Sequence, residues 1–270
     1  MRKSPLPLKS IPAVLGFVCL AAGFFQPVAV RAQDGEMGRI RIKPGLGVEY
    51  FSRTIVWDEG LSSSKLKTTI GLVRAEVELE KGFLLGLCGG YSLSNFNGMI
   101  FRQLPFSIDY EAGNIGSFFW GADLDKNLFS LDPYEIGVQA QFVMSLGRQK
   151  ELAVSGLNQT GTLIGKGRWQ RAGIGPVIRY TGYEDFIPFL AISYNKLWGT
   201  FAMAETVQTL TGTEEKAISG GGSIGIAFGT TFNPSEAFNL KAEITALPYK
   251  KTGGGLDVDY GASLKVVVLF

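Results

Sequence analysis

Same-face pairs of carboxylates are the residues in this chain best placed to do chemistry. Glu76 and Glu78 are two residues apart, as are Asp257 and Asp259, and this spacing puts both side chains of a pair on one face of a β-strand. Two carboxylates held together can divide the roles of general acid and general base between them. The alternative is that each pair neutralises Arg and Lys side chains on neighbouring strands, and we favour this structural role.

The chain contains no histidine. Hydrolases that pair a histidine with a serine or an aspartate need an imidazole, because its pKa near neutrality lets it take and return a proton. None of these mechanisms can operate without that side chain. We therefore predict no catalytic residues and expect that the protein is not an enzyme.

Cofactor and metal motifs are weak. Gly220, Gly222 and Gly225 match the spacing G-x-G-x-x-G, which binds dinucleotide phosphates when it joins a strand to a helix. Here the glycines lie inside a strand pattern, so we expect them to relieve strand curvature. Asp123 and Asp125 could offer oxygen ligands to a weakly bound cation. Without histidine, however, we predict no metal site and no cofactor.

The final stretch, Asp257 to Phe270, is the clearest structural element in the sequence. Tyr260, Leu264, Val268 and Phe270 share one apolar face, and their period of two is that of a β-strand. A tilted strand of this length can cross about 25 Å of hydrocarbon. A last strand of alternating apolar residues that ends in Phe resembles the closing strand of bacterial outer-membrane β-barrel proteins. The resemblance implies that these four residues form an assembly signal read by the barrel-assembly machinery.

The N-terminal segment has the features of a signal peptide. Basic residues precede an apolar stretch at 11–25, and a small-residue cleavage site ends at Ala32. A permanent anchor helix is the alternative, but about 15 apolar residues are short for a membrane span. We divide the chain into a cleaved signal peptide, residues 1–32, and an outer-membrane β-barrel domain, residues 33–270. Cleavage removes four of the 26 basic residues and none of the 24 acidic ones, so the mature chain is slightly acidic and we expect no nucleic-acid partner.

Alternating segments continue from residue 39 to the end, so we predict an all-β fold. It is a transmembrane antiparallel β-barrel of about twelve strands, with long extracellular loops and short periplasmic turns. The count depends on residues 95–133, which we interpret as two strands near 104–112 and 118–124. If this stretch is a long external loop or a hairpin extension, the barrel has ten strands. Residues 196–216 are predicted to form a long loop.

Charged side chains are expected on the inward faces of the strands. Cations and acids are nearly equal in number, which favours ion pairs across the lumen. Arg53, Asp109 and Glu111 are assigned inward on the same pattern. The lumen-lining charges that we predict are Arg39, Arg41, Lys43, Glu49, Arg74, Glu76, Glu78, Glu135, Arg171, Arg179, Lys241, Glu243, Asp257, Asp259 and Lys265.

These features favour an integral protein of the bacterial outer membrane that acts as a passive, porin-like channel for small solutes. The alternative is a structural or surface-interaction barrel with an occluded lumen that acts through its extracellular loops. An enzyme is the least favoured class, because the lipases, deacylases and proteases among outer-membrane barrels rely on histidine. The partners that we expect are outer-membrane lipid and lipopolysaccharide, and the barrel-assembly machinery during biogenesis. We expect a monomer.

Overall fold

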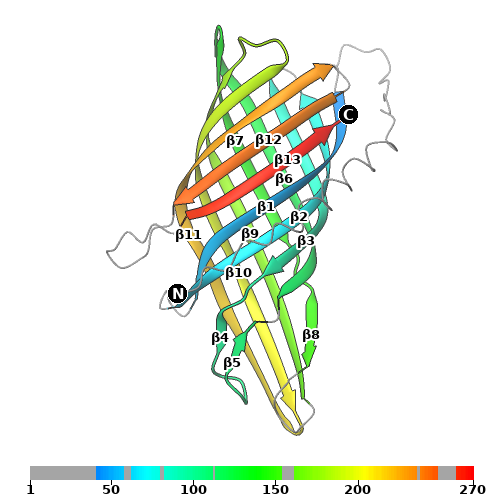
Figure 1. Cartoon of the computed structure of the whole chain (residues 1–270), viewed down its shortest axis with the longest axis vertical. Coiled ribbons are helices and arrows are strands. Elements are labelled where there is room, and N and C mark those ends of the chain that lie inside the picture. Colours follow the sequence, from blue (N-terminus) through cyan, green and yellow to red (C-terminus); the bar gives the residue numbers. More distant parts are fainter. Residues whose placement is uncertain are drawn as a thin grey trace, which may run out of the picture.

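A closed ring of ten antiparallel strands forms the body of the molecule (Figure 1). The computed structural model describes residues 41–57, 62–79, 82–111, 113–153, 161–235, 238–248 and 260–270. In the order in which they pair, the ring strands are β1 (Arg41–Trp57), β2 (Ser62–Leu79), β3 (Phe83–Asn95), β6 (Asn114–Leu131), β7 (Tyr134–Ser145), β9 (Gly161–Tyr180), β10 (Phe186–Val207), β11 (Leu210–Ser235), β12 (Phe238–Pro248) and β13 (Tyr260–Leu269), which pairs with β1. Within these ranges, no helix has the length and apolar character needed to cross a membrane. The closed ring of antiparallel strands confirms the predicted β-barrel.

Side-chain alternation separates an apolar outside from a packed inside. On β2, Val73 is 57% exposed on the outer surface, whereas its neighbour Arg74 is 7% exposed and points inward. The same alternation exposes Ile174 on β9 and Leu264 on β13. Large apolar side chains thus cover the exterior of the ring, as contact with hydrocarbon requires.

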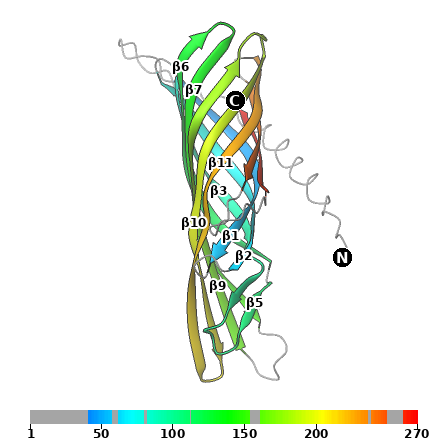
Figure 2. The same cartoon turned by 90° about the vertical axis from the view of Figure 1, so that its left-hand side faces the viewer.

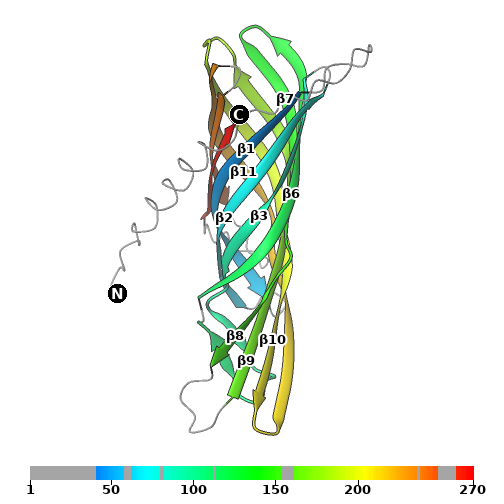
Figure 3. The same cartoon turned by 90° about the vertical axis from the view of Figure 1, so that its right-hand side faces the viewer.

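The two ends of the barrel differ in their connections. β1 begins and β13 ends at the same end of the ring, where Gly45 pairs with Leu269 (Figures 1 and 3). The connections at this end are tight, and between β6 and β7 only Asp132 and Pro133 turn the chain. Short turns mark the periplasmic end of outer-membrane barrels. We therefore take the opposite end as extracellular.

At the extracellular end, β9, β10 and β11 run on beyond the ring (Figure 2). There β8 (Gln149–Ala153) pairs with β9, and β10 and β11 stay paired up to a two-residue turn at 208–209. Most of the predicted loop at 196–216 is therefore strand, which corrects the sequence interpretation. The pattern is inverted relative to the membrane part, because Phe201 and Met203 point inward while small and polar residues meet water.

Ten strands in the ring correspond to the alternative count. β4 (Met99–Phe101) and β5 (Ile108–Tyr110) form a separate two-stranded sheet, so the predicted strand at 104–112 does not belong to the barrel. The predicted strand at 118–124 does belong to it, as part of β6. The short β8 pairs only with β9 among the described strands and lies outside the ring.

The ring becomes narrower towards the extracellular end. Residues Gly45 to Ser52 of β1 pair with β13, but further along β1 Val56 pairs directly with Ser219 of β11. At that level β12 and β13 no longer separate the two strands, so eight strands surround the interior. An eight-stranded barrel has an interior just wide enough to be filled by side chains.

A β-bulge lies at the same level. The pairing of β10 with β11 steps from Leu197–Gly221 to Trp198–Ser219, which leaves Gly220 as an extra residue. The bulge reverses which residues of β11 point inward: Ile218 is buried inside, although it is an even number of residues from Ile224, which is exposed on the outer face. Because a one-residue shift exchanges the two faces of a strand, sequence alternation alone could not follow β11 through the bulge.

Candidate functional site

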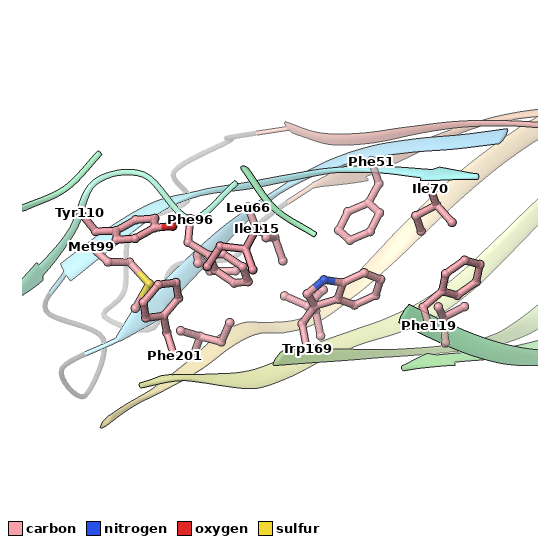
Figure 4. Packing of buried hydrophobic residues seen from close by; sticks show 14 of the residues in the cluster. Phe51, Leu66, Ile70, Phe96, Met99, Tyr110, Ile115, Phe119, Trp169 and Phe201 are labelled. Atoms are coloured by element: carbon pink, nitrogen blue, oxygen red, sulfur yellow. The ribbon is translucent and has the colours of Figure 1, made fainter. Parts of the chain in front are cut away.

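Aromatic and aliphatic side chains fill the narrow part of the lumen. Phe51 from β1 and Trp169 from β9 meet edge to face, with ring centroids 4.9 Å apart (Figure 4). Leu197 and Ile55 are fully buried in the same cluster. Interiors packed in this way leave few voids larger than a water molecule. We call this group of four residues the apolar plug.

Hydrogen bonds link several of the buried polar groups around the plug. The Trp169 indole nitrogen donates to Ser94 Oγ at 2.9 Å, and Ser92 Oγ lies 2.9 Å from Ser117 Oγ on the next strand. Because buried hydroxyl and indole groups cost free energy unless they are hydrogen-bonded, these contacts stabilise the filled lumen.

Two buried arginines close the lumen near the plug. Arg171 Nη2 lies 2.6 Å from Glu49 Oε1, and both side chains are about 5% exposed. Its guanidinium also stacks on Phe51, 4.9 Å from the ring centroid. Arg53 crosses from β1 to β10 and β11, where Nη2 donates to Ser223 Oγ at 2.9 Å and to the carbonyl oxygens of Asn195 and Gly220. The Arg171–Glu49 pair joins β9 to β1 on the opposite side of the ring, and Arg53 joins β1 to the nearby β10 and β11.

The periplasmic half of the lumen holds a charged network and a small cavity. Arg74 forms a bidentate ion pair with Asp123, and its Nη2 also lies 3.1 Å from Glu76 Oε2. The same Glu76 oxygen forms an ion pair with Lys241 Nζ, at 2.6 Å. A cavity of about 120 Å³ lies beside this network, and Lys265 also lines it. Space of this size holds a few water molecules. None of the four plug residues lines this cavity.

Outside the membrane, the β4–β5 hairpin packs on the inward face of the extended strands. Phe96 and Tyr110 contact Phe201 of β10, with ring centroids 5.0 and 4.8 Å from that of Phe201 (Figure 4). Gly167 allows the close approach of Phe96, because a Cβ atom there would lie 2.6 Å from the ring. Burial raises the pKa of Tyr110 to about 12. The hairpin and β8–β11 therefore share an apolar core, and we call this unit the extracellular module.

Two buried carboxylates hold the hairpin in place. Glu214 Oε2 accepts a hydrogen bond from the backbone nitrogen of Gln103 at 2.7 Å, and Glu205 Oε2 accepts one from Phe106 at 3.0 Å. Lys216 neutralises Glu214 at 3.0 Å. Hydrogen bonds to a charged acceptor are stronger than neutral ones. The hairpin is thus a fixed part of the module.

The predicted lumen charges are brought together only in part. Those placed in buried ion pairs are Glu49, Arg74, Glu76, Arg171 and Lys241, while Arg179 pairs with Asp125. Glu243 and Lys265 line the cavity, and Thr245 Oγ1 donates to Glu243. Lys43 and Glu135 are half-buried, whereas Arg41 and Glu78 are exposed and face each other across β1 and β2 at the periplasmic end. Arg39, Asp257 and Asp259 lie outside the described residues.

Two further inward assignments are corrected. Asp109 lies in β5 and Glu111 just after it, and both are exposed in the extracellular module instead of lining the lumen. Their alternating pattern belongs to the small hairpin. Asp123 and Asp125, considered above as cation ligands, are each engaged by an arginine.

The residues of the assembly signal lie where a closing strand should be. Leu264 faces outward, and the backbone nitrogen of Phe270 donates to the Pro44 oxygen at 2.8 Å. The Phe270 ring lies 6.5 Å from that of Phe238 on β12. The side chain of Tyr260 is outside the described residues, and Val268 pairs with both Leu46 and Leu240.

Sequence reasoning missed the apolar plug and the carboxylates of the module. Phe51, Trp169 and Leu197 occupy inward positions that the barrel pattern reserves for polar residues. The alternation of the strand could have located Trp169, because it is two residues from Arg171 and so lies on the same inward face. Gly220, Gly222 and Gly225 lie in β11, at and after the bulge. No group of three or more metal-ligating side chains occurs among the described residues.

Comparisons with known proteins leave the function open. No family model matches the sequence, and no curated protein matches it. Among solved structures, the chain is similar to the outer membrane protease OmpT from Escherichia coli, with a TM-score of 0.43, 12% identity and coverage of 88% of this chain and 96% of that one. It is also similar to the translocator domain of the autotransporter NalP from Neisseria meningitidis, with a TM-score of 0.42, 9% identity and coverage of 97% and 95%. An outer membrane channel from Pseudomonas putida gives a TM-score of 0.36 with 13% identity and coverage of 89% and 100%. These structures are bacterial outer-membrane β-barrels with different activities.

Proposed function

We propose that the protein is a non-conducting outer-membrane barrel that anchors an extracellular interaction module. The observation that carries the proposal is the apolar plug, because its four residues are buried in one cluster inside the barrel. Ile55 lies beside Val56, where β1 pairs directly with β11, and Phe51 lies where β1 still pairs with β13. A hydrated ion could pass only if these side chains moved and their contacts were lost. The plug therefore supports the surface-interaction alternative over a porin-like channel.

The extracellular module supplies the second argument. Its buried residues around Phe201 belong to the same cluster as the apolar plug, and Glu205 and Glu214 bind the hairpin through its backbone. A folded, two-layered unit of this kind outside the membrane offers a rigid surface of defined shape. Loops that only join strands need no such core. We assign the interaction role to this module and no catalytic role to the chain, which lacks histidine.

Single-channel recording in planar bilayers tests the proposal. The wild-type protein should give no discrete conductance steps. The double variant Phe51→Ala/Trp169→Ala, which removes the two rings of the plug, should give steps. A matched control is Trp120→Ala/Phe142→Ala, because these rings also touch, with centroids 5.4 Å apart, but lie on the outer face.

The control should stay silent, and heat modifiability on gels would establish that each variant is folded. Discrete steps from the wild-type protein would contradict the proposal and favour the porin-like channel. If the plug variant does not fold, the wild-type recording alone still decides between the two functions.

Surface labelling tests the position of the module. In a Cys88→Ser background, Thr211→Cys near the tip of β10–β11 should react with a membrane-impermeant maleimide on intact cells. Ser130→Cys, which is exposed at the opposite end of the barrel, should react only after the outer membrane is opened. The reverse pattern would show that the module faces the periplasm and would remove the basis of the proposal.

A further inference from the structure

A band of aromatic rings lies on the outer surface of the barrel towards its extracellular end. Trp120 and Phe142 touch at 5.4 Å between ring centroids, and Phe142 and Trp198 at 6.4 Å. The three side chains come from β6, β7 and β10 and lie on the outer face of the barrel. Tryptophan and other aromatic residues concentrate at the level of the lipid headgroups. The band therefore locates the headgroup region of the outer leaflet.

Cations lie on the same outer face at and beyond this band. Lys196 is on the membrane side of Trp198, and its Nζ lies 5.8 Å from the centre of the Trp198 ring, so its charge leans towards the extracellular end. Arg168 and Lys166 lie further out on β9, beyond Gln170, which pairs with Trp198. These two side chains share one face of the strand, with a spacing of about 7 Å. All three cations are exposed.

The environment of Arg168 suits a phosphate group. Its Nε donates to Thr200 Oγ1 at 2.8 Å, which holds the guanidinium along the outer face. The nearest carboxylate is that of Glu215, 4.0 Å from Nη2, and both side chains of this pair are more than half exposed. An ion pair this long and exposed contributes little. A phosphate could therefore engage the guanidinium in the bidentate manner that arginine favours.

We propose that Lys166, Arg168 and Lys196 form a binding site for the phosphate groups of an outer-leaflet glycolipid, with the aromatic band contacting its apolar part. The site commits to a lipid-borne phosphate, because the three cations lie beside the aromatic rings on the outer face and a free anion would gain nothing from those rings. Lys150 lies nearby but donates to the Asn114 oxygen at 2.9 Å, and the Glu151 carboxylate is the other acid next to the site, since Glu151 pairs with Ile164 on β9.

Native mass spectrometry of the full protein in detergent micelles tests the site. The probes are bis-phosphorylated lipid A and the same lipid without its phosphates. The wild-type protein should bind the phosphorylated lipid about tenfold or more tightly, since each cation near a charged lipid surface contributes appreciably to binding. The variant Lys166→Gln/Arg168→Gln should lose most of this preference. Lys126→Gln is the matched control, because Lys126 is an outward cation beside Phe83 at the periplasmic end.

The control should keep the wild-type preference, and Glu215→Gln should strengthen it by freeing Arg168. Equal binding of the two lipids by the wild-type protein would overturn the proposal, as would an unchanged preference in the double variant. A loss of the same size in Lys126→Gln would show that net charge and not this site is responsible. Competition by millimolar inorganic phosphate would show that the site takes free anions, which also refutes the lipid assignment.

Discussion

The ion pair between Glu49 and Arg171 allows a quantitative test of whether the lumen is dry. Its N–O distance is 2.6 Å, and both side chains are about 5% exposed. Removing one partner leaves an uncompensated charge in a packed interior, which typically costs about 3–5 kcal/mol. We therefore expect Glu49→Gln and Arg171→Met each to lower the free energy of unfolding by about this amount.

The double variant should be far less damaging than the sum of the single variants. With both charges removed, neither partner is left unpaired, so we expect a coupling free energy of at least about 2 kcal/mol. Urea titration of the protein refolded into lipid vesicles, followed by tryptophan fluorescence, measures all four proteins. Arg168 and Glu215 provide the matched pair, because their 4.0 Å contact is exposed and should couple by less than about 1 kcal/mol.

Additive effects at Glu49 and Arg171 would refute the reasoning. Water and salt in an open pore would screen the two charges from each other, and each could be removed without stranding its partner. A coupling as small as that of Arg168 and Glu215 would therefore argue against the apolar plug as a seal. It would favour the porin-like channel over the non-conducting barrel as the function of the protein.

Three further predictions follow from the structure. Leu264→Arg should destabilise the refolded protein by about 2–4 kcal/mol in a urea titration, because the charge enters hydrocarbon, and a loss below about 1 kcal/mol would put Leu264 outside the lipid region. Deletion of Phe270 should reduce the amount of heat-modifiable protein in the outer membrane while export continues, because Phe270 bonds to Pro44 and packs near Phe238; normal insertion would contradict its role as an assembly signal. Glu205→Ala combined with Glu214→Ala should speed proteolysis of residues 102–107 on intact cells, because both hydrogen bonds from the hairpin backbone to these carboxylates are lost. The control Glu215→Ala should leave the cleavage rate unchanged. Equal rates in all proteins would show that the apolar core alone holds the hairpin.

The membrane part of the fold could be predicted because lipid imposes a strict alternation. Val73, Ile174 and Leu264 lie on the outer face that the sequence assigns to them. There an apolar residue at every second position has one cause, which is contact with hydrocarbon. Strand identity and facing follow from it without knowledge of the pairing.

The extracellular module could not be predicted in the same way, because water reverses the rule. In β10 beyond the membrane, Phe201 and Met203 point inward and Thr206 points outward, so the apolar positions switch faces relative to lipid-exposed strands. The alternation expected of lipid-exposed strands therefore fails there, and the sequence predicts a loop for residues 196–216. The bulge at Gly220 adds a second break, since it changes the parity of β11 with no mark in the sequence beyond a run of glycines.

The sequence favours an open, water-filled lumen, whereas the lumen in the structure is largely filled by side chains. Ser263 points inward, as the alternation requires, but it is only 8% exposed. It pairs with Phe51 of β1, which belongs to the apolar plug. An arginine there would meet packed side chains and not open water, so Ser263→Arg should be costly for steric reasons. Charge balance in the sequence is compatible with either interior, because it does not reveal how many strands surround each level of the lumen.

The direct contact between Val56 and Ser219 gives the C-terminal hairpin a particular mechanical role. β1 already meets β11 at one level, so β12 and β13 act as a wedge that spreads these two strands apart towards the periplasm. The girth of the barrel is thus set by one hairpin at the end of the chain. In a chain without β12 and β13, the strands from β1 to β11 could still close into a barrel. The closing contact would be the direct pairing of β1 with β11 that the full protein already has at its narrow level.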